Sequence, residues 1–224
     1  MLSFFRKSPT GLEHIVSKAV GMLGDARHSF DLATLALLTD TDAEAVDGDI
    51  RATDERMGQT ERELLTELVV HVSVQGGGGT DIGSVFGLIQ LINKIARIAA
   101  QADNVLDLAG EGVTLAGQPD TELLLEERIE ISALFAQVAD LMTTADEEAL
   151  ADLSRRCAKL QEGHQAKIIG YLHSEEPGHT VVPRAIYYRY LKRIVANLRG
   201  VARAITEPIS AIDDIHDEDP EADA

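Results

Sequence analysis

The feature that most constrains this chain is a spacing of three and four residues between aliphatic side chains, which recurs over most of its length. In the first segment this spacing joins eight residues: Leu12, Ile15, Ala19, Met22, Ala26, Phe30, Ala33 and Leu37. Residues three and four apart share one face of an α-helix, so each such series predicts an amphipathic helix with a buried stripe. Aromatic residues make up 4% of the chain and tryptophan is absent. A core of Leu, Ile, Val and Ala therefore favours helices over sheets.

Breaks between the stripes predict six helices. The first runs from about Leu12 to Leu38, and Thr41 or Asp42 is expected to cap the second. The second helix is expected to end at about Val74, because the glycines at 76–79 disfavour a helix. The remaining helices are expected from Thr80 or Asp81 to about Ala109, around the stripe at 131–141, from Thr144 to the SEEPGH loop, and from about Pro183 to Ile205.

The third and sixth helices are similar enough to be copies. With a shift of 96 residues, the stripe that starts at Leu91 aligns with the one that starts at Tyr187, and Arg97 matches Arg193. The second and fifth helices align with a shift of 104. The same order of helices, found twice, indicates an internal duplication. The predicted fold is all-α: six long helices form two tandem, pseudo-symmetric three-helix bundles. The predicted units are 1–112, 113–207 and an acidic disordered tail at 208–224, with the bundles end to end as the simplest arrangement.

Charge and cysteine content restrict the partners and the compartment. The formal net charge of −18 repels nucleic acid and anionic lipid, so neither is expected as a general partner. The single cysteine, Cys157, lies on a stripe, fits a reducing compartment and is expected to be buried. No run is expected to span a bilayer, and MLSFFRKSP lacks the features of a signal peptide. The sequence predicts a cytoplasmic protein with at most peripheral membrane contact through a partner.

The duplicated three-helix unit resembles the PhoU family of phosphate-transport regulators. The third helix of each unit in that family carries a motif close to E-R-I-G-D-H-A-x-N-I, and the matching stretches here are ARIAAQADNV (96–105) and KRIVANLRGV (192–201). The family's carboxylates, four residues apart on one helix face, can hold metal ions through oxygen. Those positions here are Ala96, Ala100, Lys192 and Ala196, which offer no carboxylate. The resemblance therefore implies the scaffold without the metal cluster, and no cofactor is expected.

The function that this resemblance implies is non-enzymatic. The chain is expected to regulate phosphate uptake or phosphate signalling by docking on a phosphate-transporter subunit or a sensor kinase, and to form homodimers. One alternative is a metal-binding helical bundle with ligands elsewhere, such as His173 and Glu175, or Asp54, Glu55 and Glu61. Others are an accessory protein of an inorganic-phosphate permease and a bundle with no link to phosphate. No nucleophile with an adjacent base is identified, so no enzyme activity is predicted.

The sixth helix concentrates basic residues in a very acidic chain. The candidate surface for a partner or an anion consists of Arg189, Lys192, Arg193, Arg199 and Arg203. By the 96-residue match, Arg199 and Arg203 stand where the other half has Asp103 and Asp107. The competing interpretation, ranked ahead, is that these cations pair with the protein's own carboxylates.

Three further features have structural interpretations that are preferred to functional ones. His164 lies on the stripe of the fifth helix and is expected to be a core histidine hydrogen-bonded to a neighbour. His173, Glu175, Glu176 and His179 surround Pro177-Gly178, which favours an ordinary turn over a metal site. The glycines at 76–79 are not followed by the Lys-Ser or Lys-Thr of a phosphate-binding loop, and are expected to link two helices.

Overall fold

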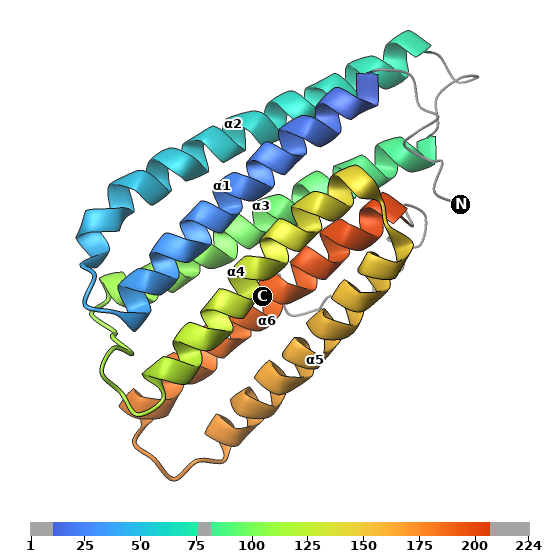
Figure 1. Cartoon of the computed structure of the whole chain (residues 1–224). Coiled ribbons are helices and arrows are strands. Elements are labelled where there is room, and N and C mark those ends of the chain that lie inside the picture. The colour runs from blue at the N-terminus through green and yellow to red at the C-terminus, as the bar shows by residue number, and fades with distance from the viewer. Residues whose placement is uncertain (1–10, 76–81, 207–224) are drawn as a thin grey trace.

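The computed structural model describes residues 11–75 and 82–206. Over these ranges the chain forms helices and no strand, and the helices lie side by side as long rods (Figure 1). At 1.5 Å per residue the longer ones measure about 40 Å. The bounds are α1 (Gly11–Leu38), α2 (Ala43–Gln75), α3 (Ile82–Gly110), α4 (Thr121–Thr144), α5 (Glu147–Leu172) and α6 (Gly178–Thr206). The predicted all-α class with six long helices is confirmed.

Two of the helix starts are set by aspartate caps. Oδ1 of Asp42 accepts a hydrogen bond from the Glu44 backbone N–H at 3.0 Å, which makes Asp42 the cap of α2. Asp146 caps α5 by accepting from the N–H groups of Glu148 and Ala149. Three predicted features lie outside the described residues: the start of α3 at Thr80 or Asp81, the glycine link at 76–79 and the tail at 208–224. The domain boundaries stay a prediction.

The expected start of α6 at about Pro183 is wrong, because the helix begins five residues earlier, at Gly178. Proline removes one N–H from the helix ladder, which is tolerated best near a helix start. The first turn is anchored instead by the Pro177 carbonyl, which accepts from the N–H of Thr180 at 2.8 Å. Nη1 of Arg184 also donates to the Thr180 carbonyl at 2.8 Å and so adds a tie across this turn.

The helix bounds follow the same two shifts, 96 and 104 residues, that align the sequence of the two halves. Helices α3 and α6 have 29 residues each, and a shift of 96 superimposes both of their ends. A shift of 104 carries the start of α2 onto the start of α5, but α2 has 33 residues and α5 has 26. The two halves are therefore matched most closely in their third helices.

The two bundles pack side by side, so the expected end-to-end arrangement is wrong. The antiparallel pair α3 and α6 forms the main contact between the halves, and α1 packs on α4 as a second contact (Figure 1). The reason is that α3 is apolar on two faces. Besides the predicted stripe it buries a second set of residues, Leu88, Ile92, Ala99 and Leu106. A helix that is apolar on more than one face has to be buried on more than one face.

The same burial explains a feature that the sequence analysis did not expect. Helix α3 is long and apolar enough to cross a membrane by length and composition. More than half of its most apolar stretch is buried inside the bundle. Its apolar character is accounted for by packing against α1 and α6.

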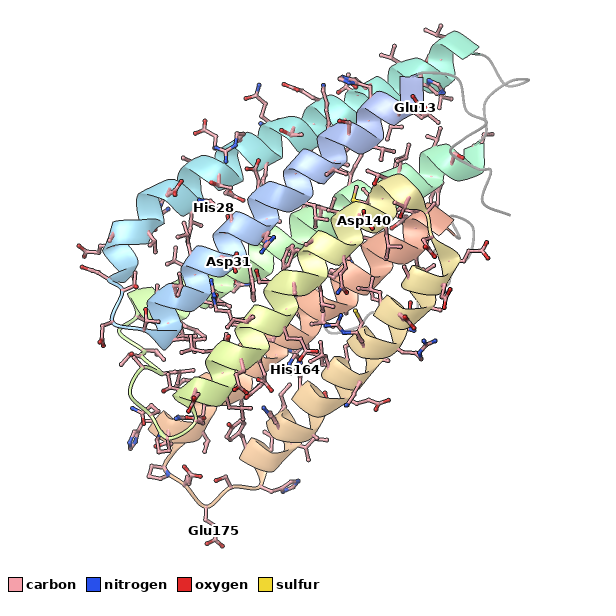
Figure 2. All side chains as sticks on the ribbon, in the orientation of Figure 1. Glu13, His28, Asp31, Asp140, His164 and Glu175 are labelled. Atoms are coloured by element: carbon pink, nitrogen blue, oxygen red, sulfur yellow. The ribbon has the colours of Figure 1, made fainter. Side chains whose placement is uncertain are left out.

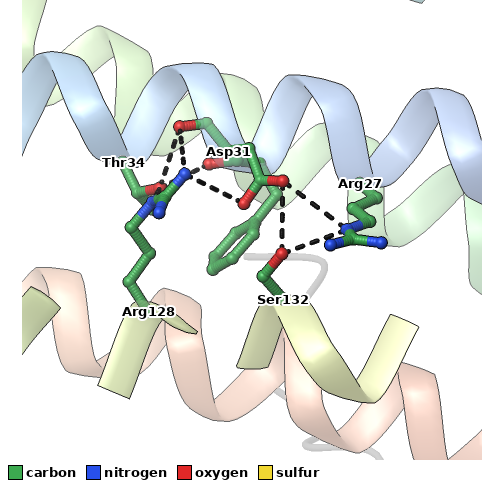
Figure 3. Close-up of polar contacts among 6 residues, drawn as sticks. Arg27, Asp31, Thr34, Arg128 and Ser132 are labelled. Atoms are coloured by element: carbon green, nitrogen blue, oxygen red, sulfur yellow. Dashed lines mark hydrogen bonds and ion pairs between the residues drawn. The ribbon is translucent and has the colours of Figure 1, made fainter. Parts of the chain in front are cut away.

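The contact between α1 and α4 combines an aromatic pair with a polar network. The rings of Phe30 and Phe135 stack with centroids 5.5 Å apart. Arg128 of α4 donates from Nε to Thr34 Oγ1 at 3.0 Å and from Nη2 to Asp31 Oδ1 at 3.1 Å (Figure 3). Ser132 Oγ donates to Asp31 Oδ2 at 3.2 Å. These contacts join residues about 100 positions apart and fix the register of one half against the other.

This network predicts a difference between two arginine substitutions. Arg128→Ala should lower the free energy of unfolding by about 1–3 kcal/mol, because it leaves partly buried Asp31 and Thr34 without their partner. Arg155→Ala is the matched control, since Arg155 is 72% exposed and pairs with Asp152 inside its own helix. It should change stability by less than about 0.5 kcal/mol. Urea unfolding followed by circular dichroism measures both, and equal losses would contradict this role for the network.

Candidate functional site

Basic residues occupy the part of α6 that reaches solvent. The apolar stripe from Tyr187 to Ile205 is buried, and α6 also buries Tyr188, Val195 and Ala202 on a neighbouring face. On what remains of the helix surface, Arg189 is exposed and the other four predicted cations are half-buried. We call this set the basic strip; it consists of Arg189, Lys192, Arg193, Arg199 and Arg203.

Two residues of the basic strip, Lys192 and Arg199, form no ion pair with a carboxylate of the described residues. Lys192 Nζ donates to the neutral amide oxygen of Gln165 on α5 at 2.9 Å. The buried Nε of Arg199 has no hydrogen-bond partner. By contrast Arg184, at the start of the same helix, forms a two-pronged ion pair with Asp120 at 2.7 and 2.8 Å. Arg184, which is not part of the strip, is therefore paired with a carboxylate, whereas Lys192 and Arg199 contact no carboxylate of the described residues.

Lys94 of α3 adds a buried cation beside the basic strip. Its side chain lies across Gly200 of α6, and a Cβ at Gly200 would come within 2.5 Å of Lys94 Cδ. A glycine is thus required for the lysine to pass between the two central helices in this position. Lys94 is 6% exposed. Sequence reasoning missed it, because its place depends on how α3 packs on α6; a glycine inside a helix was the one available signal.

The matched surface of α3 carries the opposite charge. Asp103 and Asp107 stand at the positions of Arg199 and Arg203, and Asp54 of α2 is close to them. Burial, reinforced by the negative charges of Asp54 and Asp107, raises the pKa of Asp103 to about 6, while Arg51 acts in the opposite direction. The approximate two-fold relation of the halves therefore matches an acidic surface on one to a basic surface on the other.

The positions that hold metal in the PhoU family lie on these same two helices. Ala96 is half-buried and Ala100 is exposed on α3; Lys192 and Ala196 are half-buried on α6. Across residues 11–75 and 82–206, no three His, Cys, Asp or Glu side chains are grouped so that they could hold a metal ion. The side chains present at the four positions do not fit the family's cluster.

The alternative metal ligands do not come together in the described ranges either. His173 and Glu175 are exposed in the loop after α5, and Figure 2 shows Glu175 pointing away from the bundle. His179 belongs to the first turn of α6. Asp54 and Glu55 are exposed on α2, where Glu61 is half-buried.

His164 lies inside the second bundle, next to a polar cluster (Figure 2). It is 1% exposed and its ring centroid is 5.6 Å from that of Tyr188. Lys167 Nζ donates to Glu127 Oε1 at 2.5 Å and to Tyr188 Oη at 2.7 Å. Neither ring nitrogen of His164 has a hydrogen-bond partner. The prediction that His164 is buried in the core is confirmed, and the prediction that it is hydrogen-bonded to a neighbour is wrong. Burial lowers the pKa of His164 to about 4.

A groove between α4 and α5 was not foreseen from the sequence. Helices α1 and α2 pack closely, whereas α4 and α5 touch at few positions and leave a recess of about 640 Å³. Its lining is Ala136, Gln137, Asp140, Leu141, Ala149, Asp152, Leu153, Arg155 and Arg156. Nη1 of Arg156 bridges it by donating to Gln137 Oε1 at 3.0 Å.

Cys157, as expected, is fully buried, and burial raises the pKa of its thiol to about 11.

Asp103 gives a testable dependence of stability on pH. The folded-state pKa is raised from 3.8 to about 6, so the ionised carboxylate destabilises the fold at neutral pH and protonation relieves this as pH falls from 7 towards 4. Asp103→Asn should raise the free energy of unfolding at pH 7 by about 1–2 kcal/mol and by little at pH 4. Urea titrations at the two pH values measure the difference; the same gain at both would rule out this cause.

His164 should act in the opposite direction. Its folded-state pKa is lowered from 6.5 to about 4, so its contribution to stability is complete above pH 6.5 and is lost as pH falls towards 4. His164→Leu, of similar volume, removes two buried unpartnered nitrogens and should raise the free energy of unfolding by about 1 kcal/mol at pH 7. The gain should grow as the pH is lowered to 5. A loss of stability at pH 5 relative to the unaltered chain would contradict the interpretation.

Comparison with known proteins supports the fold. The crystal structure of PhoU from Pseudomonas aeruginosa is similar with a TM-score of 0.74 and 18% sequence identity, and the match covers 91% of this chain and 98% of that chain. No family model and no curated protein sequence matches. The similarity extends over nearly the whole of both chains, so this chain has a PhoU-like fold of six helices.

Proposed function

We propose that the protein is a non-enzymatic helical adaptor that regulates phosphate uptake or phosphate-responsive signalling by docking on another protein in the cytoplasm. The observation that carries the proposal is the likeness to PhoU over 91% of this chain. Both bundles and their side-by-side packing lie within a match of that extent. A phosphate-transporter subunit or a sensor kinase is the proposed partner.

The basic strip is the proposed docking surface. Long helical faces suit recognition of partner segments, and charged side chains on such a face select the partner by its charge. Lys192 and Arg199 retain positive charge within a chain whose formal net charge is −18. A cationic surface of this kind fits an acidic segment of the partner. A homodimer, in which the acidic surface around Asp103 meets the basic strip of a second copy, would satisfy the same charges.

Docking in this protein is proposed to proceed without the family's metal cluster. Alanine offers no ligand atom, and the ammonium of Lys192 would repel a metal cation. The two Arg residues at the positions of Asp103 and Asp107 add further positive charge on the α6 side. We infer that the second half of this chain binds an anionic group of its partner where relatives hold cations.

Loss of the gene should change phosphate physiology. In the native host, deletion should alter uptake of labelled phosphate, or expression of phosphate-starvation genes, several-fold in phosphate-replete medium. The unaltered gene should restore both. If neither quantity changes on deletion, the proposed function is wrong.

Complementation then tests the surface. The double variant Lys192→Glu and Arg199→Glu should fail to restore regulation while keeping the helical circular dichroism spectrum. The double variant Arg62→Glu and Arg155→Glu, at exposed arginines on α2 and α5, is the charge-matched control and should restore it. Full rescue by the double variant would exclude the basic strip as the docking surface.

A further inference from the structure

We propose that the last part of α5, residues 164–172, is a hinged flap that opens from the second bundle while the rest of the fold stays intact. Opening exposes a polar cluster under the flap, which consists of His164, Lys167, Glu127 and Tyr188. The second half then has two states: the closed one seen in the structure, and an open one in which water reaches the cluster. This hinge belongs to the fold itself and does not depend on the proposed function.

The flap is weakly anchored by apolar contacts. The buried residues of α5 end where the flap begins: they are Leu150, Leu153, Cys157 and His164. None of residues 165–172 is buried, and Leu172 is 73% exposed. Ile168 and Tyr171 pack against the core but are only partly buried. Burial of apolar side chains is the main force that holds a helix on a bundle, so the flap is held less strongly than the part of α5 before it.

The other half of the duplication shows that this scaffold can bury the same positions. With the shift of 104 residues, the flap corresponds to residues 60–68 of α2. Leu64 and Leu68 are fully buried there, whereas the matched Ile168 is half-buried and the matched Leu172 is exposed. Helix α2 packs on both α1 and α3, while α5 packs on α6 and touches α4 at few positions (Figure 1). The weak anchoring is therefore a property of the second half and not of the fold in general.

Polar contacts hold the flap in the closed state. Nζ of Lys167 donates to Glu127 Oε1 of α4 at 2.5 Å and to Tyr188 Oη of α6 at 2.7 Å. The same nitrogen lies 4.5 Å from the centroid of the Tyr188 ring. Gln165 of the flap accepts from Lys192 of α6 at 2.9 Å. Water replaces such bonds when the flap opens, so each of them adds only modest net stability to the closed state.

The closed state also leaves polar atoms under the flap without a partner. Six buried side-chain atoms of the described residues have no hydrogen bond, and three of them belong to His164 and Glu127. Burying an unpartnered polar group costs free energy, and this cost disappears when water reaches the group. The first half has no counterpart of this cluster, because His164 matches Thr60 and Tyr188 matches Ile92. Opening is therefore favoured in the second half relative to the first.

A glycine lies at the start of the flap. Gly163 is in the interior of α5, and a Cβ at this position would meet no atom within 4 Å. No packing contact therefore requires a glycine here. Glycine weakens a helix interior relative to alanine and recurs where helices bend. Helix α5 can bend at Gly163 while the buried residues before it keep the first part of the helix in place.

Amide hydrogen exchange of the full-length chain, resolved by NMR, tests the proposal. A detached helix as short as the flap unwinds in water, so its amides exchange whenever the flap opens. Residues 165–172 should share one free energy of opening and should be about ten-fold or more less protected than residues 60–68. Protection that falls steadily towards residue 172 would indicate fraying of a helix end. Protection equal to that of residues 60–68 would mean that the flap opens only with the whole fold. Either result overturns the proposal.

Removing the polar contacts of the flap should speed its opening. Lys167→Met keeps most of the side chain but loses the bonds to Glu127 and Tyr188, and it should speed exchange of the flap about ten-fold without changing that of residues 60–68. Lys159→Met, at an exposed lysine of the same helix before the hinge, is the matched control. It should change exchange of the flap by less than about two-fold. Equal effects of the two variants would contradict the flap.

Stiffening the hinge should act in the opposite direction. Gly163→Ala adds a methyl group in open space and should slow exchange of the flap about three-fold or more. Gly48→Ala on α2, where a Cβ also meets no atom within 4 Å, is the control and should leave the flap unchanged. If Gly163→Ala has no effect, or if both variants slow the flap equally, the hinge is wrong and the proposal fails. These measurements involve no phosphate and no partner, so their outcome is independent of the test of the proposed function.

Discussion

The antiparallel contact of α3 with α6 is the interaction on which the rest of the structure depends. Each of these helices is apolar on two faces, one turned to its own bundle and one to the other half. The contact places the halves side by side, brings α1 against α4, and leaves one narrow surface of each central helix in reach of solvent. On α6 that surface carries the basic strip, and on α3 it carries Asp103 and Asp107. The positions of the basic strip and of Asp103 and Asp107 follow from this packing arrangement.

Much of this architecture could be predicted from apolar spacing alone. The stripes on α1, α3 and α6 predicted these helices and nearly all of the residues on the stripes as buried, because burial of one face is a local property of helical period. The relation between the bundles could not be predicted this way. It depends on the second buried face of α3, with Leu88, Ile92, Ala99 and Leu106, and a stripe on a helix does not say which neighbour covers it. The position of Lys94 on Gly200 depends on the packing of α3 on α6, and the groove depends on the packing of α4 on α5. Neither can be predicted from a stripe on one helix.

The candidate site was predictable in composition but not in environment. Five basic residues at helical spacing indicated a charged surface, and the structure places them along the open side of α6. Which of them are balanced was not readable from spacing, because pairing depends on neighbours from other helices. Arg184, on the same helix but outside the strip, meets Asp120 from the start of α4, while Lys192 of the strip meets an amide from α5. His164 shows the same limit: its burial follows from its stripe, but its lack of a hydrogen bond follows from Lys167, Glu127 and Tyr188 bonding to one another.

Duplication with opposite charge has a physical consequence for regulation. Two identical halves would present the same charge twice, and each would repel a partner of that charge or a second copy of itself. Here burial and the neighbouring acids Asp54 and Asp107 raise the pKa of Asp103 to about 6, while the residue at the matched position of the other half is Arg199. Protonation of Asp103 lowers the negative charge of the acidic half. Binding of an anion would lower the positive charge of the basic half. The duplicated scaffold thus carries one half whose surface charge depends on protonation and one half whose surface offers guanidinium and ammonium groups to an anion.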